Sequence, residues 1–342
     1  MNVKTWTIVS NKKHNAFTDL IFWKEQYWLV YVSSPSHFWS DKSKIVVSRS
    51  KDGKNWSEVA RLDVPGQDIR DPKFADYGKE LGIFAYLNKQ LDPSPYKTVL
   101  TRSSDGLIWS AFRDAAPVGW LLGRPIKSEG EGWYAPAHRT DHGDAALMYS
   151  INGEDWKVFS SIFTGSRDRA DETALYRQPN GTMVAVSRLE NGDAIFGSDH
   201  AGTLVSVSDA PYNSWSELFC SHHNRLDSPV LFSPPDDQRL FAVGRRQTQI
   251  RAPFQKQGSA FAPKRTALFE VFLSEENGHA QGLEKITDLP SCGDTAYAGV
   301  VVKNDRILIS YYTNDPKTDP VWLFGMLRPT QIEMAEIEIE NL

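Results

Sequence analysis

Short apolar runs separated by polar turns make up most of the chain. Such runs occur at residues 20–22, 28–32, 44–47 and 306–312. Clusters of Gly, Asp and Asn bound these runs, which have the length of β-strands rather than of helices. Residues 331–342 have a helix-favouring composition, but the alternation kept by Ile337 and Ile339 favours a strand there too. The pattern therefore predicts an all-β chain.

One turn motif occurs three times with the same internal spacing. It reads Ser-x-(Asp/Asn)-Gly-x-x-Trp, and its copies are residues 50–56, 103–109 and 150–156. An Asp-Gly or Asn-Gly pair allows the positive φ of a tight hairpin turn, and its side chain accepts hydrogen bonds from nearby backbone N–H groups. The copies recur about every 50 residues, which is the length of one four-stranded propeller blade.

Units of this length cover the whole chain. Each unit starts with a polar cluster, continues as an apolar strand, crosses a turn and forms another apolar strand. We therefore expect one six-bladed β-propeller domain over residues 1–342, with a strand near residues 5–9 closing the last blade. The expected blades are residues 14–60, 67–113, 121–160, 168–218, 225–280 and 293–340.

Composition argues against several classes of protein. The formal net charge of -5 argues against a nucleic-acid partner, which needs a basic face. Cys220 and Cys292 are too few for a disulfide framework and match no zinc-binding spacing. The chain as given has no apolar leader and no apolar run long enough to span a membrane, so we expect a cytoplasmic location. No metal or cofactor is expected, and the oligomeric state is left open.

Residues with acid, base or ligand chemistry gather where the six units start. In a propeller, the first strand of each blade lines the central channel, so the strand starts meet at one mouth, where a ligand site can form. The candidates at these starts are His14, Asp19, Arg70, Asp71, Arg124, Asp171, Glu172, Asp227 and Tyr297. Each has a structural alternative, because such residues also cap turns or form local ion pairs.

Two further arginines end apolar strands. Arg188 follows residues 183–187, and Arg245 follows residues 240–244. An arginine at such a place suits a carboxylate, because its planar guanidinium binds one in a bidentate manner. Arg246 is the neighbour that can exchange roles with Arg245.

At this point the chain resembles the sialidase (neuraminidase) superfamily of six-bladed propellers. The repeated turns are similar to the Asp boxes of that family. Residues 171–188 resemble its unit with a glutamate and an arginine, and residues 228–245 resemble the next, with another substrate-carboxylate arginine. Residues 295–311 resemble the unit with the nucleophilic tyrosine. The resemblance covers nearly the whole chain.

The resemblance implies a glycoside hydrolase that acts on a terminal sugar of a glycan, anionic sugars included. Tyr297 would be the nucleophile, Glu172 its base and Asp71 the acid, while Arg188 and Arg245 would hold a substrate carboxylate. A tyrosine needs such a base because a phenol normally titrates near pH 10.

The chain departs from the family pattern in its first unit. Residues 15–19 contain no arginine, whereas the family has Arg-Ile-Pro there. Arg70 or Arg124 is the candidate to replace that arginine. Asp19 is the alternative to Asp71 as the acid, so sialic acid itself is a doubtful substrate.

Two other functions stay open on the sequence. A polysaccharide lyase would use Tyr297 or His138 as the base, and His138 is otherwise expected among the substrate contacts. A non-catalytic glycan-binding propeller would instead stack sugars on aromatic side chains. The candidates for stacking are Trp39, Trp120, Trp133 and Tyr134.

Overall fold

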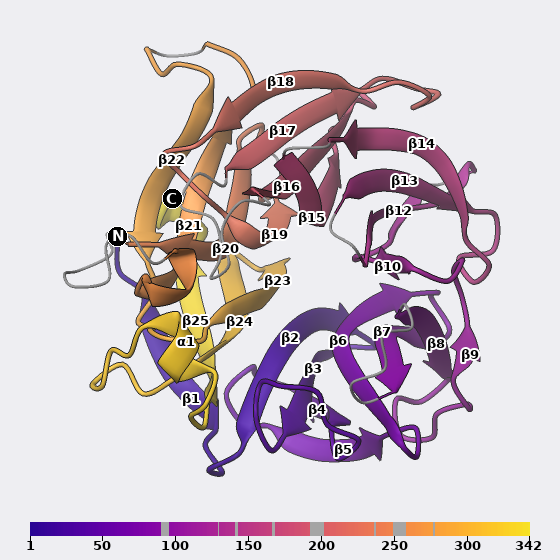
Figure 1. Cartoon of the computed structure of the whole chain (residues 1–342), viewed down its shortest axis with the longest axis vertical. Coiled ribbons are helices and arrows are strands. Elements are labelled where there is room, and N and C mark those ends of the chain that lie inside the picture. The colour runs from indigo at the N-terminus through magenta and orange to yellow at the C-terminus, as the bar shows by residue number, and fades with distance from the viewer. Residues whose placement is uncertain are drawn as a thin grey trace. The chain divides into compact units, whose positions relative to one another are not determined.

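The computed structural model describes residues 1–342 except 90–95, 129, 141–142, 166–167, 192–201, 236, 249–257 and 276–277. The described residues form 25 β-strands, one short α-helix and two single-turn 3₁₀ helices. The strands pair into six antiparallel sheets (Figure 1). The prediction of an all-β, six-bladed β-propeller is therefore confirmed. In the described residues, no helix is long and apolar enough to cross a membrane.

One compact unit comprises residues 1–119 and 289–342 and contains three of these sheets. Its first sheet consists of β2 (His14–Trp23), β3 (Gln26–Ser34), β4 (Lys44–Ser50) and β5 (Ser57–Leu62). The second consists of β6 (Gln67–Asp76), β7 (Leu81–Lys89), β8 (Lys97–Ser103) and β9 (Arg113–Asp114). The third consists of β23 (Ala296–Lys303), β24 (Arg306–Thr313), β25 (Gln331–Glu338) and β1 (Lys4–Val9). The helix α1 (Trp322–Gly325) lies between β24 and β25.

The other compact unit comprises residues 120–288 and contains the remaining three sheets. The first consists of β10 (Trp120–Leu122), β11 (Ile126–Ser128), β12 (Gly132–Arg139), β13 (Asp144–Ser150) and β14 (Lys157–Thr164). The next consists of β15 (Asp168–Arg177), β16 (Met183–Asn191), β17 (Thr203–Ser208) and β18 (Ser216–Ser221). The last consists of β19 (Asp227–Phe232), β20 (Leu240–Gln247), β21 (Lys264–Phe272) and β22 (Gly282–Asp288).

The two ends of the chain meet in one sheet, as the sequence predicts. Strand β1 pairs antiparallel with β25, with Lys4 opposite Glu336 and Thr5 opposite Ala335. The predicted strand at residues 331–342 is present up to Glu338, and a 3₁₀ turn, Ile339–Asn341, follows it. The N-terminal strand thus completes the last blade.

The first two predicted turns share one hydrogen-bonding pattern, and the third shares its serine and Asn152 bonds. In the first, the Ser50 hydroxyl donates to Asp52 (2.9 Å) and accepts the N–H of Gly53 (2.9 Å). The Asp52 carboxylate also accepts two backbone N–H groups, and the indole of Trp56 donates to the Gly53 carbonyl (2.8 Å). Residues 103–109 repeat this pattern. The serine and the acid therefore fix the turn from within.

The glycine of the second turn lies against a buried ring. Gly106 has a φ of 75°, and a Cβ there would lie 2.1 Å from the ring of Trp28. Gly66 has nearly the same φ, 73°, but open space around it.

We expect Gly66→Ala to lower the free energy of unfolding by about 1 kcal/mol through backbone strain alone. Gly106→Ala carries the same strain plus an overpacking cost of about 1–3 kcal/mol. Urea unfolding of the two variants measures the difference, and equal losses would contradict the packing role of this turn.

Candidate functional site

A two-residue bulge interrupts the first strand of five sheets at the same place. The bulges lie at residues 17–18, 71–72, 171–172, 228–229 and 297–298. In the remaining sheet, the first strand is divided into β10 and β11 around residues 123–125. The candidates Asp71, Arg124, Glu172 and Tyr297 therefore occupy equivalent positions in their sheets.

Four of these bulges hold a non-glycine residue in the left-handed region. The φ angles are 58° at Phe17, 52° at Asp71, 51° at Ser228 and 45° at Tyr297. Each such residue costs about 1–3 kcal/mol and persists only where the surrounding structure determines it. Strain of this kind is typical of functional sites, so it marks the bulge residues within each unit as candidate ligand contacts.

In the first unit, one lysine lies beside both Asp71 and Tyr297. The Lys73 ammonium is 2.6 Å from the Asp71 carboxylate and 5.6 Å from the centroid of the Tyr297 ring. The Tyr297 ring also packs edge-on against Phe17, with 4.7 Å between centroids. Lys73 is therefore a common neighbour of Tyr297 and Asp71, which the family resemblance implies as nucleophile and acid.

Arg70 belongs to the same region but is engaged by a carboxylate. Its Nε lies 2.6 Å from Asp68, and its guanidinium lies 5.8 Å from the Phe17 ring. The other Asp68 oxygen accepts the N–H of Ser40 (3.2 Å). A substrate anion at Arg70 would therefore share the guanidinium with Asp68.

Asp19 has a different environment from the other candidates. It is fully buried, and its two oxygens accept the N–H groups of Leu20 (2.9 Å) and Phe74 (2.7 Å). The bond from Phe74 ties β2 to β6, so both oxygens of Asp19 are used in backbone contacts.

A buried cluster that the sequence did not reveal surrounds Asp294. One oxygen of its carboxylate lies 2.8 Å from His14 Nε2 and 2.6 Å from His37 Nδ1. The other oxygen accepts hydrogen bonds from the Tyr312 hydroxyl (2.9 Å) and the Trp322 indole (3.0 Å). Burial opposes the charge of Asp294, but the two imidazoles outweigh it and hold its pKa well below the usual value. Burial lowers the pKa of His14.

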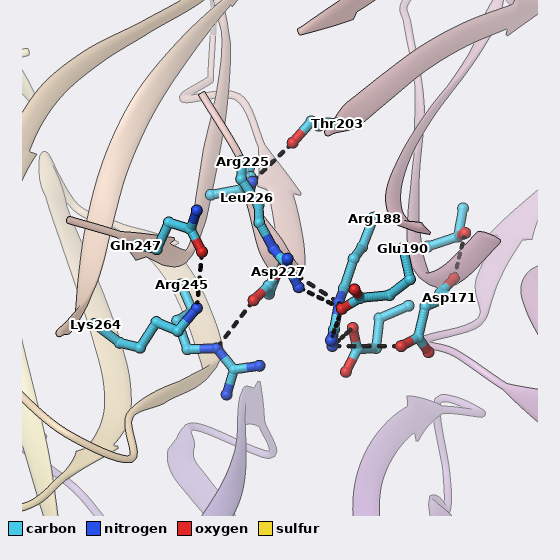
Figure 2. Close-up of polar contacts among 12 residues, drawn as sticks. Asp171, Arg188, Glu190, Thr203, Arg225, Leu226, Asp227, Arg245, Gln247 and Lys264 are labelled. Atoms are coloured by element: carbon cyan, nitrogen blue, oxygen red, sulfur yellow. Dashed lines mark hydrogen bonds and ion pairs between the residues drawn. The ribbon is translucent and has the colours of Figure 1, made fainter. Parts of the chain in front are cut away.

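In the second unit, Arg188 lies among four carboxylates. Its Nη1 is 2.7 Å from Glu172 and 3.3 Å from Asp171, and its Nε is 2.8 Å from Glu190 and 3.2 Å from Asp227. Figure 2 shows Arg188 between Asp171 and Glu190, with Asp227 nearby. Burial opposes its charge, but the carboxylates hold the pKa of Arg188 well above its usual value.

Asp227 is the centre of a buried cluster of cations. Its carboxylate lies 2.6 Å from Arg225 Nε, and 3.2 Å from the Nε atoms of Arg188 and Arg245 (Figure 2). Burial acts against ionisation, but the three arginines and Lys264 keep the pKa of Asp227 well below its usual value. Burial and the same arginines lower the pKa of Lys264 strongly. Arg188 and Arg245 therefore contact the same carboxylate. That carboxylate is the protein's own Asp227 and not a substrate group.

The remaining candidates of the second unit have other surroundings. His138 Nε2 is 3.2 Å from Asp171. Burial lowers the pKa of Arg124 to about 10, so its side chain stays charged at neutral pH. Arg246, the proposed stand-in for Arg245, instead pairs with Asp288, with 2.6 Å from Nε to Oδ1.

The sequence candidates thus divide between the two units. Those in the first are Asp19, Arg70, Asp71 and Tyr297, and those in the second are Arg124, His138, Glu172, Arg188 and Arg245. The pairing of Tyr297 with Glu172 stays a prediction, because each residue belongs to a different unit.

Four residues of these clusters were not among the candidates expected from the sequence: Glu190, Lys264, His37 and Asp294. One pattern in the sequence includes Asp294. In five of the sheets, a polar residue stands three positions before the first residue of the bulge. These residues are His14, Asp68, Asp168, Arg225 and Asp294.

Solved structures with a similar fold show which kind of propeller the chain forms. No protein-family model and no curated protein matches the sequence. Among solved structures, a protein of unknown function from Dyadobacter fermentans is 17% identical, with a TM-score of 0.71 over 98% of this chain and 99% of its own. The phage phi92 endosialidase is 11% identical, with a TM-score of 0.70 over 98% of this chain and 69% of its own. A Penicillium chrysogenum α-L-arabinanase is 12% identical, with a TM-score of 0.61 over 99% of both chains. The chain therefore has a sialidase-like, six-bladed β-propeller fold.

Proposed function

We propose that this protein is a glycoside hydrolase that acts on a terminal sugar of a glycan. The observation that carries the proposal is the pair Asp71 and Tyr297. They lie on equivalent strained bulges of β6 and β23, with the Lys73 ammonium beside both. Glycosidases on the same fold, with names that point to different sugars, support the reaction class and leave the sugar open.

In this proposal, Tyr297 attacks the anomeric carbon and forms a glycosyl–tyrosine intermediate. The Asp71 carboxylate, held 2.6 Å from the Lys73 ammonium, accepts the phenol proton. Asp71 then passes this proton to the leaving oxygen as the glycosidic bond breaks. In the second step, Asp71 takes a proton from the attacking water and passes it to the phenolate oxygen of Tyr297 as the bond between the sugar and Tyr297 breaks. Glu172 is the competing candidate for the first proton transfer.

A panel of nitrophenyl glycosides carrying neutral sugars, uronic acids and sialic acid tests the reaction class. We expect release of nitrophenol and one free terminal sugar from at least one member of the panel. With a uronate polysaccharide as a second substrate, an unsaturated uronide that absorbs in the ultraviolet would instead indicate a lyase. Binding of natural glycans without any turnover would indicate a glycan-binding propeller.

The role of Asp71 predicts a dependence on the leaving group. Asp71→Asn is expected to lower turnover on both kinds of substrate, because the base for Tyr297 and for water is lost. The loss should be about 10²–10⁴-fold larger on a glycoside with an alkyl leaving group than on a nitrophenyl glycoside, since nitrophenol leaves without a proton. The matched control is Asp63→Asn, which removes a carboxylate from an exposed pair with Lys44. Equal losses on both substrates would contradict the acid role, and a leaving-group dependence in Glu172→Gln instead would assign that role to Glu172.

A further inference from the structure

We propose that His14, His37 and Asp294 form a binding site for a divalent transition-metal ion of the Zn²⁺ type. The ligand atoms are His14 Nε2, His37 Nδ1 and one carboxylate oxygen of Asp294, all within 4.8 Å of one another. Its ligands are different residues from Asp71 and Tyr297, although the Phe17 ring lies 5.7 Å from His37 and 4.7 Å from Tyr297 between centroids. The metal-binding proposal does not depend on the proposed hydrolase activity.

The donor set matches the chemistry of zinc. Two imidazole nitrogens and one carboxylate oxygen are borderline ligands that suit Zn²⁺, and three protein ligands leave a fourth position for water. The three residues come from distant parts of the chain: His14 starts β2, His37 lies between β3 and β4, and Asp294 precedes β23. A bound ion would therefore fasten the first sheet to the last sheet of the same unit.

The surroundings of Asp294 direct one oxygen toward the histidines. The Tyr312 hydroxyl (2.9 Å) and the Trp322 indole (3.0 Å) both donate to Oδ1, which leaves Oδ2 for the imidazoles. The backbone N–H of Asp294 donates to Asn314 (2.7 Å), whose amide in turn donates to the carbonyl of Gly325 (3.1 Å). Partners of this kind orient a metal ligand before the ion arrives.

Access to the site runs past one histidine. The side chains of His14 and Asp294 are 2% and 0% exposed, whereas that of His37 is 17% exposed. His37 lies on a connection between strands, and its backbone N–H makes a long hydrogen bond to Met326 (3.4 Å). The open coordination position would therefore lie on the His37 side.

The competing interpretation is a hydrogen-bonded His–Asp–His network that needs no ion. The nitrogen–oxygen distances, 2.8 and 2.6 Å, are those of hydrogen bonds. Ligand atoms on a tetrahedral zinc ion lie about 3.3 Å apart. Binding would thus require both imidazoles to move away from the Asp294 oxygen by several tenths of an ångström. The larger of the two movements is that of His37, whose position on a connection between strands permits it.

Titration of the chelator-treated full-length protein with ZnCl₂ and CoCl₂ tests the proposal. We expect one ion per chain, a higher Tm with zinc, and the visible absorption of four-coordinate Co²⁺. His37→Ala should raise the Kd at least a hundredfold, because it removes a ligand. Trp322→Phe should raise it about tenfold, because it removes a donor that orients Asp294. The control His279→Ala changes an exposed histidine paired with Glu284 and should bind like the wild type.

The result that overturns the proposal is an absence of stoichiometric binding, or binding that His37→Ala leaves unchanged. Either outcome would assign the cluster to the hydrogen-bonded network. Metal binding, the Tm and the absorption are all measured without a substrate. A failure of the metal-site proposal can therefore be distinguished from a failure of the hydrolase proposal.

Discussion

Asp227→Asn is expected to lower the free energy of unfolding by about 3–5 kcal/mol, the cost of breaking a buried ion pair from one side. Asp227 is 1% exposed and is the carboxylate that Arg188, Arg225 and Arg245 share. The neutral amide keeps the size of the side chain but leaves three guanidinium groups of the second unit without their common counter-charge. Urea unfolding of the wild type and the variant measures the difference.

The matched control is Asp237→Asn. Asp237 pairs with Arg239 at 2.7 Å, but the side chains are 17% and 41% exposed. A pair of this kind contributes less than about 1 kcal/mol. Similar losses in the two variants would contradict the idea that Asp227 holds the cluster together.

The contribution of Asp227 also has a predicted pH dependence. Its pKa is lowered in the folded state, because the arginines outweigh the effect of burial. The stabilisation is therefore complete above the unfolded pKa, about 3.9, and is lost as pH falls through the lower folded value. The difference in stability between the wild type and Asp227→Asn should narrow only below about pH 4.

The fold was predictable because its signals are local. In the first turn motif, Ser50, Asp52 and Gly53 bond to one another and to the next two backbone N–H groups, so seven residues specify the turn. Repetition of this motif then gives the number and size of the blades. The division between β10 and β11 agrees with Pro125, which has no N–H to pair in a strand.

The candidate site was predictable only in part, because its contacts join distant segments. Position in a unit was enough to select Asp71, Glu172 and Tyr297, which lie on equivalent bulges. Position was not enough to show what each side chain meets. Arg188 and Arg245 end similar strands, and nothing in the sequence near either one names Asp227 as their common partner.

The cluster around Asp294 shows the same limit more strongly. His14 and Asp294 are 280 residues apart and 2.8 Å apart in space. Short spacings in the sequence, such as those between neighbouring metal ligands, do not reveal the pair His14 and Asp294. The first and last sheets of the unit meet only in the folded chain.

Tyr297→Phe is expected to lower turnover on an activated glycoside about 10³-fold or more while leaving the Tm unchanged. The substitution removes only the hydroxyl that attacks the sugar, and loss of a nucleophile removes most of the rate enhancement. The ring keeps its edge-on packing against Phe17 (4.7 Å) and its place beside Lys73 (5.6 Å). The backbone carbonyl still accepts the Thr18 hydroxyl at 2.7 Å. These ring and backbone contacts are therefore kept in the variant, and the Tm measures any contribution of the hydroxyl.

The control for this variant is Tyr149→Phe, which removes a hydroxyl that donates to the Glu131 carbonyl (2.9 Å) in the second unit. It should retain full turnover. Mass spectrometry of the wild type, quenched during turnover, should find a sugar attached to the peptide that contains Tyr297. Full activity of Tyr297→Phe, or a sugar attached to another residue, would remove Tyr297 as the nucleophile. If the variant is fully active and no residue carries a sugar, Asp71 would act on a bound water rather than on a phenol, and the reaction would proceed without a glycosyl–enzyme intermediate.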